Sequence, residues 1–197
     1  MSQLLDFGQN IAGYIAFHVQ AKEGQKLSFR FGEMLDDDGN LTQKNIQCVN
    51  KTKVSPLQQI HYICREGEND YKTSFSVFGF QYAEVETDVE LCASDVKAIA
   101  VYSDIEQTGR FESSNELLNR FVAATIWSTK GNSLEIPTDC PTRERHGWTG
   151  DAQIFFETAN YLFDYSAFSK KYLNDVYDWQ KKRTKKASLN WQKNSVK

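Results

Sequence analysis

The spacing of apolar residues along this chain of 197 residues changes near residue 104. Before that point apolar and polar residues alternate, which is typical of half-buried β-strands. The alternating segments are residues 15–19, 27–31, 60–64, 78–82 and 96–102. In the fourth segment, the alternation predicts that Phe78, Phe80 and Tyr82 lie on the same face. The first half of the chain is therefore expected to be rich in strands.

Turn-forming residues separate these segments at 23–25, 36–40 and 66–69. Several short strands joined by such turns indicate an antiparallel β-sandwich, which we assign to residues 1–104. The acidic turn at 36–40 does not have calcium-loop spacing, because Gly39 is fourth and Gln47 twelfth. An EF-hand loop has Gly sixth and Glu twelfth. We therefore expect a solvated hairpin turn and no metal site.

After residue 104 the apolar residues recur at the three- and four-residue intervals of a helix. Ser113 and Glu116 form a capping-box pattern, so we expect a first helix with Ser113 as its N-cap. Gly131 is a natural end for this helix. Its apolar face is expected to contain Leu117, Leu118, Phe121, Val122 and Ile126.

A second helix is expected to begin at 149–151, with Ala152, Phe155 and Phe156 on its buried side. A third is expected from about Ser166, with Trp179 on its buried side. The three helices are candidates for antiparallel packing through short connections. The apolar pattern ends at residue 181, after which we expect frayed helix followed by disorder.

Charge is distributed unevenly, since residues 181–197 hold seven Lys or Arg and no Asp or Glu. An acidic body with a basic tail lacks the basic stripe of a nucleic-acid surface. No segment approaches the roughly 20 apolar residues of a membrane span. The start of the chain also lacks the features of a secretory signal. We therefore expect no nucleic-acid or membrane partner, and a cytoplasmic location unless an export signal lies outside this sequence.

The cysteines show no metal-binding pattern. They are Cys48, Cys64, Cys92 and Cys140. No pair has Cys-x-x-Cys spacing, and no histidine lies at zinc-ligand spacing from them. We expect reduced thiols without a shared role, and one disulfide in a secreted setting remains the alternative.

The segment between the first two expected helices, residues 136–151, carries the chemistry. Two prolines and two glycines restrict its backbone, which predicts an ordered loop. The segment combines carboxylates, arginines, a histidine and a tryptophan. The carboxylates are Asp139, Glu144 and Asp151; the other side chains are Arg143, Arg145, His146 and Trp148. Carboxylates and arginines hydrogen-bond sugar hydroxyls, and an indole ring packs on the apolar face of a pyranose.

A second interpretation of the same residues is structural. Asp151 could cap the second helix, and Glu144 could pair with Arg143 or Arg145 at the surface. His146 alone is more often a hydrogen-bonded loop residue than a catalyst. Composition leaves both interpretations open. Glycoside hydrolysis usually needs two carboxyl groups, one of them acting as an acid.

The string DCPTRERHGWTGD, residues 139–151, closely resembles the signature of bacterial α-L-rhamnosidases, glycoside hydrolase family 78. Many members carry one more Asp before the Glu and a Leu near His146, so this chain has a shorter form of the signature. The resemblance continues to about residue 180. Residues 4–41 resemble the β-sandwich domain of the family, 75–86 its aromatic strand, and 108–119 with 130–151 the opening of its catalytic domain.

This resemblance implies an (α/α)6-barrel catalytic domain and an inverting mechanism without a cofactor or metal. It makes Glu144 the general acid that protonates the leaving oxygen. It makes Asp139, Arg143 and Asp151 ligands of the rhamnose hydroxyls, and Trp148 part of the sugar-binding wall. The general base of the family is a Glu further along, and no segment of this sequence resembles that region.

Residues 105–197 have room for three or four helices, whereas an (α/α)6 barrel has twelve. We therefore expect an antiparallel β-sandwich followed by the amino-terminal part of the barrel. The sequence then corresponds to a fragment cut at both ends, whose basic tail fits a premature stop or a shifted reading frame.

A fragment of this kind is expected to be inactive alone and to self-associate through its unpaired helices. Its expected partner is a rhamnose-containing glycoside or polysaccharide. The alternatives are a non-catalytic carbohydrate-binding or structural fragment, and an (α/α)6 hydrolase for another sugar.

Overall fold

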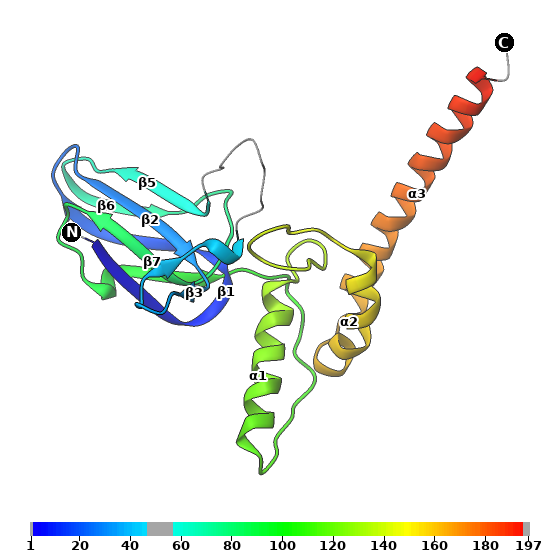
Figure 1. Cartoon of the computed structure of the whole chain (residues 1–197), viewed down its shortest axis with the longest axis horizontal. Helices are drawn as coiled ribbons and strands as arrows, with labels where there is room; N and C mark the ends of the chain where they lie inside the picture. The colour runs from blue at the N-terminus through cyan, green and yellow to red at the C-terminus, as the bar shows by residue number, and fades with distance from the viewer. Residues whose placement is uncertain (1, 47–56, 195–197) are drawn as a thin grey trace.

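The computed structural model describes residues 2–46 and 57–194, with side chains up to Arg183. Antiparallel strands fill the first part, and three α-helices follow (Figure 1). The expected order of an antiparallel sheet domain followed by helices is confirmed. Cys48 and Gln47, which entered the sequence predictions, lie outside the described residues.

One main sheet dominates the first part. Its strands are β1 (Ser2–Ala21), β2 (Lys26–Gly32), β5 (Gln59–Ile63), β6 (Gly67–Lys72), β7 (Phe78–Thr87) and β8 (Val96–Ala100). They lie in the order β5-β2-β7-β1-β6, and β8 also pairs with β1. All the pairings are antiparallel. This part also contains two short 3-10 helices, Lys44–Ile46 and Ala93–Asp95.

The long strand β1 folds the sheet over itself. Its first half pairs with β7, and its second half pairs with β6 and β8, with an irregular register between Asp6 and Ile11. As a result, the Phe17 ring lies 5.7 Å from that of Phe29 on β2 and 5.2 Å from that of Tyr62 on β5. The two layers share one apolar core, which is the principal source of stability for this part.

Two predictions for the strands were wrong in detail. The predicted turn at 66–69 lies mostly within β6, and the chain instead turns at residues 64–66. Tyr82 is partly exposed, while its neighbour Ala83 is buried. The buried face of β7 changes because its partner β1 loses register just after Asp6, which pairs with Tyr82.

The acidic turn is a hairpin, as expected. It joins β3 (Met34–Leu35) to β4 (Leu41–Thr42). The Asp36 carboxylate accepts hydrogen bonds from the backbone N–H groups of Asp38 and Asn40, at 3.1 and 2.8 Å. These contacts satisfy the carboxylate oxygen within the turn itself.

Helix α1 (Glu116–Gly131) begins later than the capping box predicts. Its N-cap is Asn115, whose side chain accepts a hydrogen bond from the N–H of Leu117 at 3.0 Å. Ser113 instead bonds the side chain of Asn119 through its backbone. Asparagine is at least as favourable as serine at an N-cap, so Asn115 is the N-cap in place of Ser113. The predicted end at Gly131 is confirmed.

Helices α2 (Thr149–Leu162) and α3 (Ser166–Asn194) form an antiparallel pair joined by three residues (Figure 1). The ring of Phe156 lies 6.0 Å from the rings of both Tyr165 and Tyr172. The predicted starts of both helices are confirmed. The connection between α1 and α2 is long rather than short, because it spans residues 132–148 and contains most of the 139–151 signature. The expected fraying was wrong too, since α3 continues through residue 181 to Asn194.

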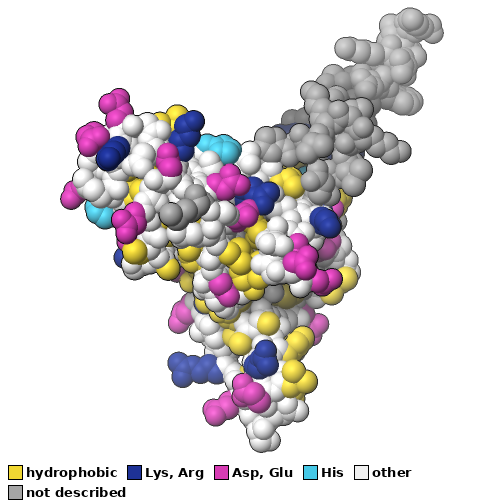
Figure 2. Space-filling view, turned by 60° about the vertical axis from the view of Figure 1, so that its left-hand side comes forward, with side chains coloured by type: hydrophobic (Ala, Val, Ile, Leu, Met, Phe, Trp, Pro, Cys, Tyr) yellow, Lys and Arg dark blue, Asp and Glu magenta, His cyan; other side chains and the backbone are white. Residues whose placement is uncertain are grey.

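The apolar face predicted for α1 is largely exposed to solvent. Leu117 is 72% exposed and Phe121 is 68% exposed. Trp179, on the predicted buried side of α3, is 67% exposed. Figure 2 shows apolar side chains on the surface of the lower part of the molecule, where α1 lies. The α1 face therefore lacks a covering partner within the described residues.

Candidate functional site

The signature loop, residues 132–148, starts against the sheet and ends at α2. At its start the carboxyl end of α1 lies on β1, where Gly131 approaches Ala12 and Trp127 packs on the sheet core. The loop then closes on itself. The N–H of His146 donates to Asp139 Oδ1 at 2.9 Å, and the N–H of Asp139 donates to the carbonyl of His146 at 3.1 Å. The prediction of an ordered loop is consistent with these bonds.

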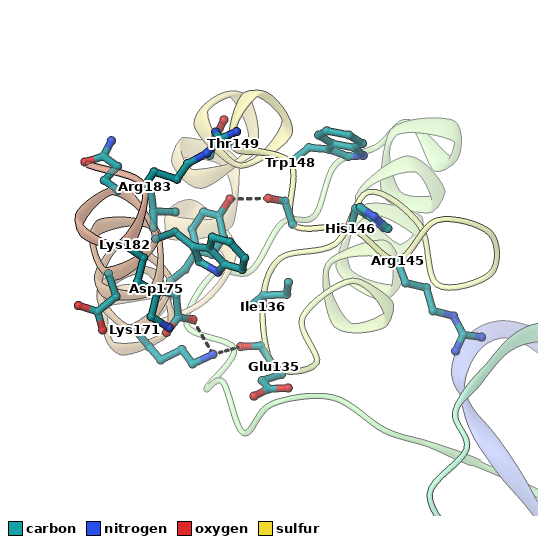
Figure 3. A pocket seen from close by; sticks show the side chains of 16 residues that line it. Glu135, Ile136, Arg145, His146, Trp148, Thr149, Lys171, Asp175, Lys182 and Arg183 are labelled. Carbon is teal, nitrogen blue, oxygen red and sulfur yellow. Dashed lines mark hydrogen bonds and ion pairs between the residues drawn. The ribbon is translucent and has the colours of Figure 1, made fainter. Parts of the chain in front are cut away.

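Helix α3 holds the other side of the loop. The Tyr172 hydroxyl donates to the carbonyl of Gly147 at 2.8 Å, and Lys171 Nζ donates to the carbonyl of Glu135 at 3.0 Å (Figure 3). A Cβ atom at Gly147 would lie 2.8 Å from Ile136 Cδ1 and 3.3 Å from the Tyr172 ring, so the loop packs closely on both side chains at this glycine. Burial, and then the charge of Asp151, raises the pKa of Tyr172, which keeps its hydroxyl available as a donor.

Two of the predicted site residues share a cavity of about 320 Å³. Asp139 reaches it from the loop and Asp151 from the first turn of α2. Hydroxyl, amide and aromatic groups complete its lining, among them Ser128, Asn132, Thr138, Phe155 and Tyr165. The volume lies within the range of small-molecule sites. Carboxylates beside aromatic rings suit a sugar, which offers hydroxyl groups and apolar C–H faces.

A larger cavity of about 1020 Å³ lies between the loop and α3 (Figure 3). Trp148 and His146 line it from the loop, and Tyr172 and Trp179 line it from α3. The imidazole of His146 stacks on the indole of Trp148, with ring centres 5.5 Å apart. Trp148 therefore lies in a different cavity from Asp139 and Asp151.

Arg143 and Glu144 lie between Asp139 and Trp148 along the loop and line neither of these two cavities. Arg143 approaches Glu144 Oε1 at 3.3 Å, and the indole N–H of Trp148 donates to Glu144 Oε2 at 3.4 Å. The Glu144 side chain is 36% exposed. The surface pairing with Arg143 that the second interpretation suggested is therefore present. The same contacts join Glu144 to Trp148.

Hydrogen bonds stabilise the charged form of Asp139. Burial is the largest influence and acts to raise the pKa of Asp139. Together, the hydrogen bonds that Asp139 accepts, first from the His146 backbone N–H and also from the Cys140 thiol, outweigh burial, so the pKa of Asp139 is below its usual value. Asp139 is therefore ionised at neutral pH and can accept hydrogen bonds from a ligand.

Sequence reasoning missed a role for Cys140. Its thiol donates to Asp139 Oδ2 at 3.5 Å and accepts from the N–H of Glu144 at 3.2 Å. The described cysteines, Cys64, Cys92 and Cys140, are free. No sequence signal pointed to this contact, because an isolated cysteine carries no spacing pattern.

Two further alternatives are now resolved. Asp151 does not cap α2, since the N-cap is Trp148 and makes no side-chain cap bond. His146 is held in the loop, where its Nδ1 bonds the carbonyl of Glu144 and its ring stacks on Trp148.

Among the described residues, no His, Cys, Asp and Glu side chains cluster in a way that could hold a metal ion. No helix in the described part of the chain is long and apolar enough to cross a bilayer.

A cavity lined by carboxylates, hydroxyl and amide groups and aromatic rings is typical of proteins that bind sugars. Residues 2–102 match the model of the bacterial alpha-L-rhamnosidase concanavalin-like domain. Residues 106–189 match that of the bacterial alpha-L-rhamnosidase 6 hairpin glycosidase domain. The chain belongs to the bacterial α-L-rhamnosidase family, as its resemblance to that family implied.

Individual relatives agree with this assignment. The chain is 37% identical to an alpha-L-rhamnosidase of Formosa agariphila over 175 residues, covering 88% of this chain and 18% of that protein. The solved alpha-L-rhamnosidase of Dictyoglumus thermophilum is 35% identical, with a TM-score of 0.83 over 90% of this chain and 20% of its own. The Streptomyces avermitilis alpha-L-rhamnosidase complexed with L-rhamnose is 31% identical, with a TM-score of 0.83 over 90% of this chain and 17% of its own. The sequence thus spans about a fifth of the length of these relatives.

Proposed function

We propose that this chain supplies the acid and part of the sugar-binding site of an inverting α-L-rhamnosidase. The observation that supports this most strongly is the shared cavity. Asp139 and Asp151 lie at opposite ends of the signature, and both line one space of about 320 Å³. Their carboxylates, with the hydroxyl and amide groups around them, suit the hydroxyls of a terminal rhamnose.

In this proposal each predicted site residue has one role. Asp139, held ionised by its hydrogen bonds, and Asp151 accept hydrogen bonds from sugar hydroxyls. Arg143 offers planar donors to the sugar, and Trp148 forms an apolar wall. Glu144 protonates the glycosidic oxygen as the bond to the anomeric carbon breaks, while water attacks that carbon from the opposite face.

The base that activates this water is not assigned to a residue of this sequence. An inverting enzyme holds its two carboxyl groups roughly 6.5–9.5 Å apart, with a water between them. Asp139 and Asp151 are the neighbouring carboxylates, and the proposal gives both to sugar hydroxyls. We therefore propose that a polypeptide of residues 1–197 binds rhamnose but does not hydrolyse rhamnosides at a useful rate.

Titration of the chain with L-rhamnose, followed by NMR of the tryptophan indole N–H groups, tests the sugar-binding part. We expect weak binding, with a dissociation constant of about 1 mM or above, because a monosaccharide offers few contacts. Asp139→Asn and Asp151→Asn should each abolish it. Asparagine at 139 can still accept the His146 N–H, so the loop keeps its closure. Asp104→Asn, an exposed change outside the site, is the matched control.

Two results would contradict the proposal. The first is equal binding of L-rhamnose and D-glucose, which would indicate a non-specific surface. The second is rhamnose binding that survives in the Asp151→Asn variant as it does in the Asp104→Asn control. Specific binding by a chain that remains inactive even when joined to the rest of a relative would favour a non-catalytic carbohydrate-binding role.

A further inference from the structure

A glutamine of the sheet domain connects that domain to the signature loop. Gln58 lies directly before β5, and its side chain pairs with β7 as a neighbouring strand would. Its Oε1 accepts from the N–H of Gly79 at 2.8 Å, and its Nε2 donates to the carbonyl of Gly79 at 2.9 Å. These two bonds fix the position of the Gln58 amide.

The same Oε1 atom also accepts a hydrogen bond from Arg145 Nη2 at 3.1 Å. Figure 3 shows the Arg145 side chain extending from the loop away from α3 and toward the sheet. Arg145 has a φ of 51° and Gln58 a φ of 29°, both in the left-handed region that side chains disfavour. Such backbone strain persists where surrounding contacts hold it in place.

A second contact between loop and sheet lies at the glycine that Gln58 holds. A Cβ atom at Gly79 would lie 2.4 Å from Thr142 Cγ2 and 3.0 Å from Pro141. The loop therefore rests closely on β7 at Gly79, where any larger residue would displace Thr142. Gln58 bonds both this glycine and Arg145, so one side chain joins two of the points where the loop meets the sheet domain.

The position of Arg145 makes this attachment relevant to the sugar site. Arg145 lies between Glu144 and His146, and the N–H of His146 bonds the Asp139 carboxylate. We propose that Gln58 is a positioning residue: by fixing Arg145 it holds Glu144 and Asp139 in place from the sheet domain. Its consequence for sugar binding rests on the proposed function, whereas its effect on the loop does not.

Amide hydrogen exchange measured by NMR on the 197-residue chain tests the proposal. The reporter is the His146 N–H, which is protected by Asp139. Gln58→Ala should raise its exchange rate about three- to tenfold, since it removes a hydrogen bond to a charged group that is partly exposed. Gln43→Ala is the matched control, because the Gln43 side chain donates to the carbonyls of Phe31 and Leu57 and, in the described part of the chain, makes no hydrogen bond to the loop.

Gln58→Glu separates positioning of the loop from support of the sheet. A glutamate keeps an acceptor for Arg145 but cannot donate to the Gly79 carbonyl. We expect His146 exchange within about twofold of the unchanged chain, because an ion pair between the glutamate and Arg145 replaces the bond from Arg145 to the neutral amide. If Gln58→Glu raised exchange as much as Gln58→Ala, or if Gln58→Ala had no effect, the positioning role would be overturned.

An L-rhamnose titration of the same variants completes the test. We expect Gln58→Ala to weaken rhamnose binding and Gln58→Glu to restore it. If the unchanged chain bound no rhamnose, the proposed function would fail while the exchange result still decided the effect on the loop. If Gln58→Ala loosened the loop but bound rhamnose equally well, the inferred consequence for the sugar site would be overturned.

Discussion

A buried hydroxyl pair forms part of the wall of the Asp139–Asp151 cavity and provides a sharp test of the packing. The Tyr165 hydroxyl and Ser133 Oγ lie 2.6 Å apart, and each residue is 1% exposed. Burial raises the pKa of Tyr165, as expected for a phenol kept from water. The pair ties the second residue after α1 to the residue just before α3.

Replacing one partner leaves the other buried without a hydrogen bond. Tyr165→Phe should lower the free energy of unfolding by about 2 kcal/mol, within the usual 1–3 kcal/mol for such a group, since water cannot reach it. Ser133→Ala should cost a similar amount. The double variant removes both groups, so it should cost clearly less than the sum of the single changes.

Urea denaturation, followed by tryptophan fluorescence, measures these differences. Tyr161→Phe is the matched control, because Tyr161 is 73% exposed and its loss should change the unfolding free energy by under about 0.5 kcal/mol. If the single effects of Tyr165→Phe and Ser133→Ala added up in the double variant within about 0.5 kcal/mol, the two hydroxyls would not be coupled and the reasoning would be refuted.

Three further predictions concern the sheet and the exposed helix. Gly79→Ala should destabilise the chain by about 1–3 kcal/mol in the same urea assay, and Thr142→Ser should recover part of this because it removes the nearest methyl group. The hydrogen bond to Asp70, and then the charge of Asp70, raise the pKa of His18 above 6.5. The contact therefore stabilises the fold below about pH 6.5, and this stabilisation is lost as the pH rises through the raised pKa. NMR titration should show a lower His18 pKa in Asp70→Asn, and an unchanged pKa would contradict this. Self-association through α1 should appear in sedimentation velocity and weaken in Phe121→Gln, since Phe121 is 68% exposed; a monomer at all concentrations would refute it.

Local patterns predicted the elements but not every boundary. Alternation identified the strands around Phe17 and Phe29 because one face of each segment packs in the apolar core and the other face does not. It failed at Tyr82, where the irregular register of β1 changes which face of β7 is buried. The capping-box prediction failed because Asn115 is an equally good N-cap and accepts the N–H of Leu117.

The signature loop was found from its composition, but its geometry was not. Proline and glycine predicted an ordered loop, and the residue types pointed to sugar chemistry. The contacts of Gln58 with Arg145 and of Tyr172 with Gly147 join residues far apart in sequence. A single sequence holds no local signal for such contacts, since they depend on how the sheet and α3 meet the loop.

The role of Glu144 as general acid is the central claim, and a chimera tests it most directly. Residues 2–180 would replace the matching segment of the full-length Formosa agariphila α-L-rhamnosidase, which is 37% identical over 175 residues. The chimera is expected to release L-rhamnose from aryl α-L-rhamnosides. Glu157→Gln, an exposed change on α2, serves as the control.

The deciding measurement is kcat/KM of the Glu144→Gln chimera for a series of aryl rhamnosides whose leaving groups differ in acidity. We expect a loss of about 10²–10⁴-fold for poor leaving groups, which need a proton, and a much smaller loss for good ones. A loss that is equal across the series would assign Glu144 to binding, and no loss beyond that of Glu157→Gln would contradict any role in the reaction.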